Sequence, residues 1–152
     1  MTTMIAGFPA REAVRRDPAT QAYVLLRIVF IVAPILFGLD KFANVLTDDW
    51  TKYLATPFND ILPGDAATAM HIIGVVEIAA GLLVLIAPRI GSLIVAGWLA
   101  GIILDLLIKG GYGDIALRDF GLLLGALTLA RLATAFGPDG ERGASGAHPS
   151  LR

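Results

Sequence analysis

Four apolar stretches of about 20 residues constrain this chain more than any other feature. They cover residues 23–42, 69–87, 90–108 and 115–136. Each is close to the length of about 20 residues that a helix needs to cross the hydrocarbon core of a bilayer. A segment in lipid must satisfy its own backbone hydrogen bonds, so the stretches predict helices. We therefore expect an all-α integral membrane protein built as a four-helix bundle.

Composition supports a membrane class and excludes several activities. The chain is 56% hydrophobic and 16% charged, whereas a soluble domain is about half apolar and a quarter charged. The net charge of −1 argues against a nucleic-acid partner. The absence of cysteine excludes thiolate catalysis, disulfide exchange and cysteine-ligated metal centres within the chain. No metal site is predicted.

The rest of the chain is organised around the four spans. Residues 1–21 are predicted to be a short cytoplasmic lead, 22–136 the transmembrane domain, and 137–152 a disordered cytoplasmic tail rich in Gly, Ser and Pro. Pro88 and Arg89 leave a very short connection between the second and third spans. We expect these two helices to form a tight antiparallel hairpin.

The distribution of positive charge predicts the orientation. Of the 12 Lys and Arg residues, eight lie on the side of the termini and four on the other side. Cytoplasmic segments of membrane proteins carry an excess of these residues. Both termini are therefore predicted to be cytoplasmic.

The loop between the first two spans, residues 43–68, has a pattern of its own. We expect one or two short amphipathic helices at the membrane interface, where Trp and Tyr are favoured. Asp48 or Asp49 is a suitable helix cap. The segment is either a simple interfacial anchor or a lid over a cavity. Its apolar positions, which alternate with Asp and Lys, are Trp50, Tyr53, Leu54, Phe58 and Ile61.

Among the ionisable residues within or at the ends of the spans, five are candidates for a site, namely Lys41, Glu77, Asp105, Arg118 and Asp119. A charge at the centre of a membrane helix costs roughly 2.5–3.5 kcal/mol on insertion scales. A chain that retains several such charges uses them for a buried site or for locking its helices together.

In each predicted helix a charge shares a face with glycine. Small residues mark the places where membrane helices approach closely. We therefore expect the charges to face the interior of the bundle. The pairs are Gly38 with Lys41, Gly74 with Glu77, Gly101 with Asp105, and Gly121 with Arg118.

Depth in the membrane separates Glu77 from the other charges. Glu77 is near the predicted midplane, and the other four lie in the outer third with Asp40 and His71. Together with Glu77, this polar region holds four carboxylates and two bases, Lys41 and Arg118, so two carboxylates lack a partner. Glu77, with no base level with it, is the first candidate for a neutral, proton-exchanging acid, followed by Asp119. Such a pocket suits a carbonyl-bearing or anionic small molecule such as a quinone.

Structural roles are open for the same residues. Asp105 with Arg118, or Lys41 with Asp119, could be buried salt bridges that fix the helix register. Asp40 could be a solvated charge at the membrane edge, and Arg27 could extend to the cytoplasmic headgroups. His71, at a helix start, is typical of an interfacial position.

Three segments together resemble the DoxX family of small bacterial four-helix membrane proteins. They are RIVFIVAPILFGLDKF, GVVEIAAGLLVLIAPRIG and LDLLIKGGYGDIALRDFGLLLGALTLA, in the order of the family, and the resemblance covers residues 22–135. It implies a protein of the bacterial cytoplasmic membrane. One branch of that family is the membrane subunit of a thiosulfate:quinone oxidoreductase.

The resemblance implies a link to a quinone or redox system but not a reaction. No self-contained catalytic motif is present, so enzyme activity stays open. Because the chain has no cysteine, electrons would come from a protein partner in a redox or respiratory complex or pass directly to a bound quinone. Two alternatives are a non-catalytic accessory or scaffold subunit, and a small transporter, which with four helices would be expected to act as a homodimer.

Overall fold

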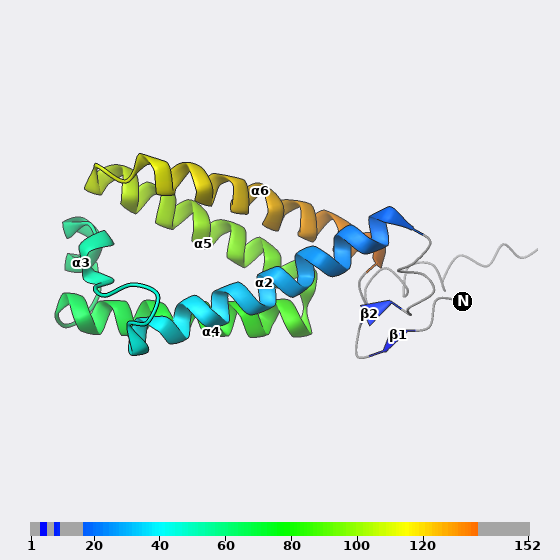
Figure 1. The fold of residues 1–152 in the computed structure, drawn as a ribbon, viewed down its shortest axis with the longest axis horizontal. Coiled ribbons are helices and arrows are strands. Elements are labelled where there is room, and N and C mark those ends of the chain that lie inside the picture. Colours follow the sequence, from blue (N-terminus) through cyan, green and yellow to red (C-terminus); the bar gives the residue numbers. More distant parts are fainter. Residues whose placement is uncertain (1–3, 6–7, 10–16, 137–152) are drawn as a thin grey trace, which may run out of the picture.

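The computed structural model describes residues 4–5, 8–9 and 17–136, and four long helices dominate it (Figure 1). Each of the four is long and apolar enough to cross a membrane, which confirms the predicted fold class. Two short strands, β1 (Met4–Ile5) and β2 (Phe8–Pro9), pair antiparallel before the first long helix. The long helices are α2 (Pro18–Ala43), α4 (Ala66–Ile86), α5 (Pro88–Lys109) and α6 (Gly113–Phe136).

Helices α2 and α4 begin earlier than their apolar stretches because polar caps lie just outside them. Asp17 accepts from the backbone N–H groups of Ala19 and Thr20, and Pro18 occupies the first helical position. Asp65 caps α4 by accepting from the N–H of Thr68 at 2.8 Å. Hydrogen bonding by Thr68 holds the pKa of Asp65 below its ordinary value.

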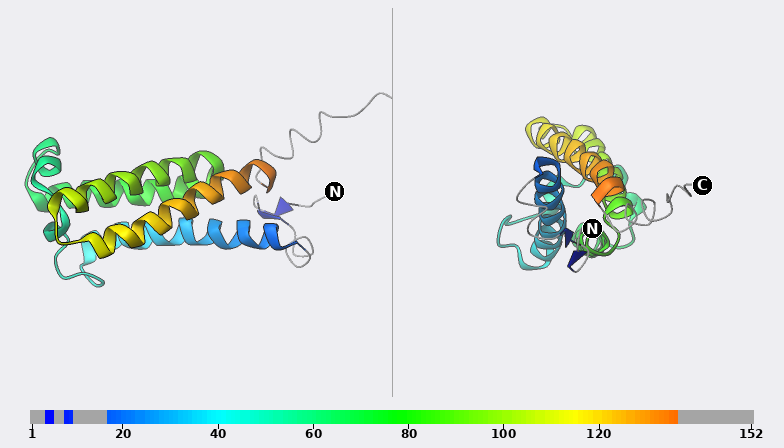
Figure 2. Two further views of the ribbon diagram at one scale, coloured as in Figure 1. Left: turned by 90° about the horizontal axis from the view of Figure 1, so that it is seen from above. Right: turned by 90° about the vertical axis from the view of Figure 1, so that its right-hand side faces the viewer.

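The four helices are arranged as two antiparallel pairs, α2 with α4 and α5 with α6 (Figures 1 and 2). We call the end that carries residues 44–65 and the α5–α6 connection the loop end. The opposite end, where α4 turns into α5, is the hairpin end, and α2 starts and α6 finishes there. Only Ala87 joins α4 to α5. The predicted hairpin is tight at this turn, but α5 then diverges from α4 and packs mainly on α6.

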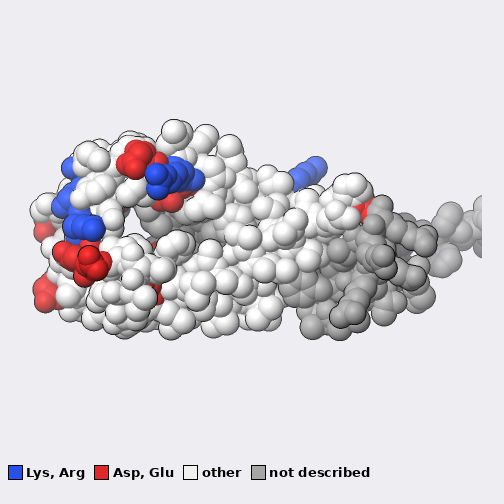
Figure 3. Space-filling model, viewed as in Figure 1, with Lys and Arg blue, Asp and Glu red and all other residues white. Residues whose placement is uncertain are grey.

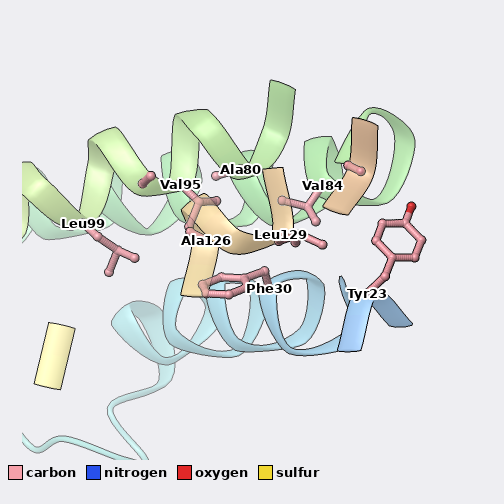
Figure 4. Close-up of a cluster of buried hydrophobic side chains, with 10 residues drawn as sticks. Tyr23, Phe30, Ala80, Val84, Val95, Leu99, Ala126 and Leu129 are labelled. Atoms are coloured by element: carbon pink, nitrogen blue, oxygen red, sulfur yellow. The ribbon is translucent and has the colours of Figure 1, made fainter. Parts of the chain in front are cut away.

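The main hydrophobic core joins all four helices at the hairpin half of the bundle (Figure 4). It includes Tyr23 and Phe30 of α2, Val84 of α4, Leu99 of α5 and Leu129 of α6. A second buried cluster at the loop end consists of Leu54, Ala69 and Met70, which belong to the loop and α4. Helices α5 and α6 contribute nothing to this second cluster, so the two helix pairs share no core at the loop end.

The glycines of α2 and α4 are in the close contact that their sequence pattern predicts. A Cβ placed on Gly38 would lie 2.5 Å from the carbonyl oxygen of Gly74, and one placed on Gly74 would lie 2.7 Å from that of Gly38. A Cβ on Gly81 would similarly lie 2.8 Å from the carbonyl oxygen of Ile31. The two backbones therefore touch along this face, which is the face that carries Lys41 and Glu77.

The same expectation is wrong for α5 and α6. A Cβ added to Gly97, Gly101 or Gly121 would meet nothing within 4 Å among the described residues. Their helices bury other faces, centred on Leu99 in α5 and on Ala126 in α6. Gly125 differs from these three glycines, because a Cβ there would contact the ring of Phe30 on α2.

The loop between α2 and α4 forms two short helical segments, as predicted. These are a 3-10 turn, η1 (Thr51–Tyr53), and α3 (Thr56–Ile61). Asp49 accepts from both the N–H and the hydroxyl of Thr51, so it fixes the start of η1. These hydrogen bonds hold the pKa of Asp49 below its ordinary value.

Candidate functional site

The centre of the candidate site is a buried ion pair between α2 and α4. The Lys41 ammonium donates to Oε2 of Glu77 at 2.6 Å, and both side chains are more than nine-tenths buried. The prediction that Glu77 lacks a basic partner is therefore wrong. Lys41 lies one helical turn beyond Gly38, and the Gly38–Gly74 contact brings the helices close enough for the two side chains to meet.

The loop covers this ion pair with an aromatic ring. The ammonium nitrogen of Lys41 lies 4.1 Å from the centre of the Trp50 ring, a cation–π contact. The Trp50 indole N–H donates to Oδ2 of Asp40 at 2.9 Å. Oδ1 of Asp40 accepts from the N–H groups of Val45 and Leu46, each at 2.8 Å. Asp40 is thus buried and hydrogen-bonded, unlike the solvated charge considered from sequence.

The other helix pair presents an acid and an indole towards the ion pair. Asp119 precedes the fully buried Ala126 by seven residues, two helical turns, and therefore lies on the interior face of α6. It has no hydrogen-bond partner among the described residues, and the charge of Glu77 acts on it. The Nε1–H of Trp98 on α5 is buried and unbonded within the described residues, and it is close enough to Glu77 to act on its carboxylate.

Two predicted site residues lie elsewhere. Asp105 accepts from the backbone N–H of Ala55 at 2.8 Å, so it holds the loop and does not pair with Arg118. Arg118 is 77% exposed at its side chain and lies 3.8 Å from Asp114 on its own helix. Neither of the considered salt bridges, Asp105 with Arg118 or Lys41 with Asp119, is formed.

Arg27 and His71 also have defined positions. Arg27 is only 1% exposed, and its guanidinium donates to the Tyr23 hydroxyl and to the Leu85 carbonyl at the end of α4. The expectation that it extends to the headgroups is therefore wrong. The His71 ring stacks on Phe42, with 4.8 Å between centroids and 5° between planes.

A small pocket gives access to Lys41 beneath the loop. Its volume is about 190 Å³. The lining includes two acids from the loop, Asp48 and Asp49, together with His71 and Trp50. The wall formed by α2, α4 and the loop therefore has an opening that reaches Lys41.

The surface is visibly hollowed at the loop end, between two groups of charged side chains (Figure 3). This hollow lies between the α2–α4 pair and the α5–α6 pair. Lys41 and Glu77 pair between α2 and α4, and Trp98 of α5 and Asp119 of α6 lie near Glu77 on the other helix pair. Such a set can hydrogen-bond a small polar group, and its carboxylates can give or take a proton. Among the described residues, no group of His, Cys, Asp and Glu could hold a metal ion.

Sequence reasoning missed the roles of both tryptophans. Trp50 was predicted only as an interfacial residue, and its contact with Lys41 depends on the path of the loop. Trp98 lies within an apolar span, and nothing in its local pattern distinguishes it from a lipid-facing residue.

Compared with known protein families, with curated proteins and with solved structures, the chain matches none.

Proposed function

We propose that this multi-pass membrane protein is a subunit of a redox system and binds a quinone-like molecule in the hollow at its loop end. The resemblance to the DoxX family supports the redox link. The single observation that carries the site is the buried Lys41–Glu77 pair, covered by Trp50 and faced by Asp119. A buried ionisable residue within a membrane helix is by default a functional candidate.

The residues around the hollow suit the two carbonyl oxygens of a quinone. Lys41 and the buried indole N–H of Trp98 are donors for those oxygens. Glu77 and Asp119 are the proton-exchange groups. Reduction of a quinone to a quinol consumes two electrons and two protons, and in this proposal the electrons come from a partner protein. Arg118 takes no part, because its side chain is exposed on α6.

The proposal includes the location of the protein. The excess of Lys and Arg on the hairpin side supports an orientation with both termini in the cytoplasm and the hollow on the outer side of a bacterial cytoplasmic membrane. A quinone-like molecule would then reach the site from the outer leaflet.

The test is quinone binding by the purified protein. The protein would be extracted in mild detergent and placed in nanodiscs, and its affinity for a short-chain quinone would be titrated. We expect Lys41→Met and Asp119→Asn to weaken binding by about tenfold or more, the effect of losing one hydrogen bond to a charged group. Arg118→Gln is the matched control at the same end of the bundle and should bind normally.

The Asp119→Asn variant keeps this test interpretable. Asp119 has no hydrogen-bond partner among the described residues, so its replacement should leave the fold intact. Normal affinity in folded Lys41→Met and Asp119→Asn proteins would rule out the quinone site.

A second function, that of a non-catalytic accessory subunit, is favoured by the way Lys41 and Glu77 satisfy each other. The pair would then lock α2 to α4 for assembly with a partner. In that case, pull-down of the partner would be lost in Lys41→Met but retained in Asp119→Asn, and neither protein would bind quinone.

A further inference from the structure

The two helix pairs are not held together by helix packing at the loop end. Asp119, Leu122 and Ala126 lie on one face of α6. Ala126 is fully buried, but Leu122, one turn closer to the loop end, is 41% exposed. The core that joins all four helices stops before this level. Something other than the helices therefore sets the width of the hollow.

Residues 44–65, which we call the strap, are attached to the α2–α4 pair at one side. Asp40 at the end of α2 binds the strap through the N–H groups of Val45 and Leu46 and through the Trp50 indole. Leu54 of the strap is buried with Ala69 and Met70 of α4.

The strap is attached to the α5–α6 pair at the other side. Oδ1 of Asp105 accepts from the Ala55 N–H at 2.8 Å, and the Lys109 ammonium donates to the Leu54 carbonyl at 3.0 Å. The Tyr112 hydroxyl donates to the Lys52 carbonyl at 3.3 Å. The Tyr112 ring also meets the Tyr53 ring edge-on, with 5.1 Å between centroids.

The attachment points are adjacent in the chain. Ala55 and Leu54 are 1% and 6% exposed, so their backbone groups are shielded from water and need partners. Asp105 and Lys109, one helical turn apart on α5, supply one acceptor and one donor for these two residues. The Asp105 carboxylate and the Lys109 ammonium thus hold the strap backbone at these two residues, and we call this pair of hydrogen bonds the clamp.

We propose that the strap is a gate, and that the Asp105–Lys109 clamp on Leu54 and Ala55 holds it closed over the hollow. Release of the clamp frees the central part of the strap from α5 while Asp40 keeps its first part on α2. The two helix pairs then separate at the loop end, and the hollow opens to small molecules. This gate does not depend on which molecule occupies the hollow.

The absence of cysteine from the chain makes the gate directly testable. A single cysteine at Leu122 would report access to the hollow through its rate of labelling by a charged maleimide, in protein held in nanodiscs. We expect Asp105→Ala to raise this rate about tenfold, the effect of losing one charge-assisted hydrogen bond. The Asp105→Asn variant retains an acceptor oxygen. Its cysteine at position 122 should be labelled at nearly the same rate as in the protein that keeps Asp105.

Distances between spin labels would check the movement itself. Labels at Ala67 of α4 and Leu117 of α6, both on exposed positions, report the loop end, and labels at Leu82 and Leu127 report the other half of the bundle. In Asp105→Ala and in Lys109→Met, the first distance should lengthen or broaden while the second stays fixed. Unchanged labelling rates and distances in both folded variants would overturn the gate, as would equal opening in Asp105→Asn and Asp105→Ala.

Discussion

Lys41 and Glu77 neutralise each other in a position where either charge alone would be expensive. Their 2.6 Å contact is buried, and Trp50 covers the ammonium on its other side. Removing one member of a buried ion pair leaves the other uncompensated, at a cost of about 3–5 kcal/mol. Removing both charges leaves no such penalty.

A double-mutant cycle would test whether Lys41 and Glu77 stabilise each other. Lys41→Met and Glu77→Gln should each lower the unfolding free energy in detergent by about 3–5 kcal/mol, and the double variant should recover a large part of that loss. Unfolding would be followed by circular dichroism during titration with a denaturing detergent. Simple addition of the two single losses would show that the pair is not coupled.

Asp40 shows how far a residue's role depends on its surroundings. The sequence places it beside Lys41, yet the two side chains do different things. Asp40 organises the strap through three N–H donors, and Lys41 reaches across to α4. Adjacent residues of a helix point about 100° apart, so two neighbours in the sequence need not have the same partner.

Glycine has opposite roles in the two helix pairs. In α2 and α4, Gly38 and Gly74 let the two backbones touch, and any added side-chain atom would meet a carbonyl oxygen. In α5, Gly101 lies on a face that no described residue covers. The spacing of the glycines is similar in both places, so only their surroundings distinguish them.

Alanine substitutions would separate these roles. Gly38→Ala should destabilise the protein by about 1–3 kcal/mol, because the carbonyl of Gly74 cannot move away without shifting α4. Gly101→Ala, the matched control, should be neutral or stabilise the helix by up to about 1 kcal/mol. Thermal unfolding of the purified proteins would measure both. A larger loss from Gly101→Ala than from Gly38→Ala would contradict the described packing.

The whole molecule is a bundle joined at one end and divided at the other. Its main core ties the four helices together at the hairpin half, and the strap bridges the two pairs at the loop half. Most of the charged side chains visible in this view gather at the divided end (Figure 3).

The orientation of this bundle in the membrane can be tested with single cysteines, since the chain has none of its own. Asp60 in α3 and Arg89 at the α4–α5 turn are exposed and lie at opposite ends. In intact cells, a membrane-impermeant maleimide should label Asp60→Cys directly and Arg89→Cys only after permeabilisation. The reverse pattern would place the hollow on the cytoplasmic side.

The sequence by itself determined the four spans, the aspartate cap in the loop between the first two spans, and the charged residues that needed an explanation. These properties depend on segments of about 20 residues, and hydropathy and capping are local. It also predicted that the faces carrying both glycine and charge point into the bundle, which is correct for α2 and α4.

Only the tertiary structure decided which charges pair and which glycines are buried. Lys41 meets Glu77 because two backbones touch at Gly38 and Gly74. Asp105 holds the strap because Ala55, 50 positions earlier in the chain, is placed against it. Such contacts depend on the rotation and tilt of whole helices, which neighbouring helices set. Hydrophobic residues cover nearly every face of a membrane helix, so a sequence pattern fixes that rotation poorly.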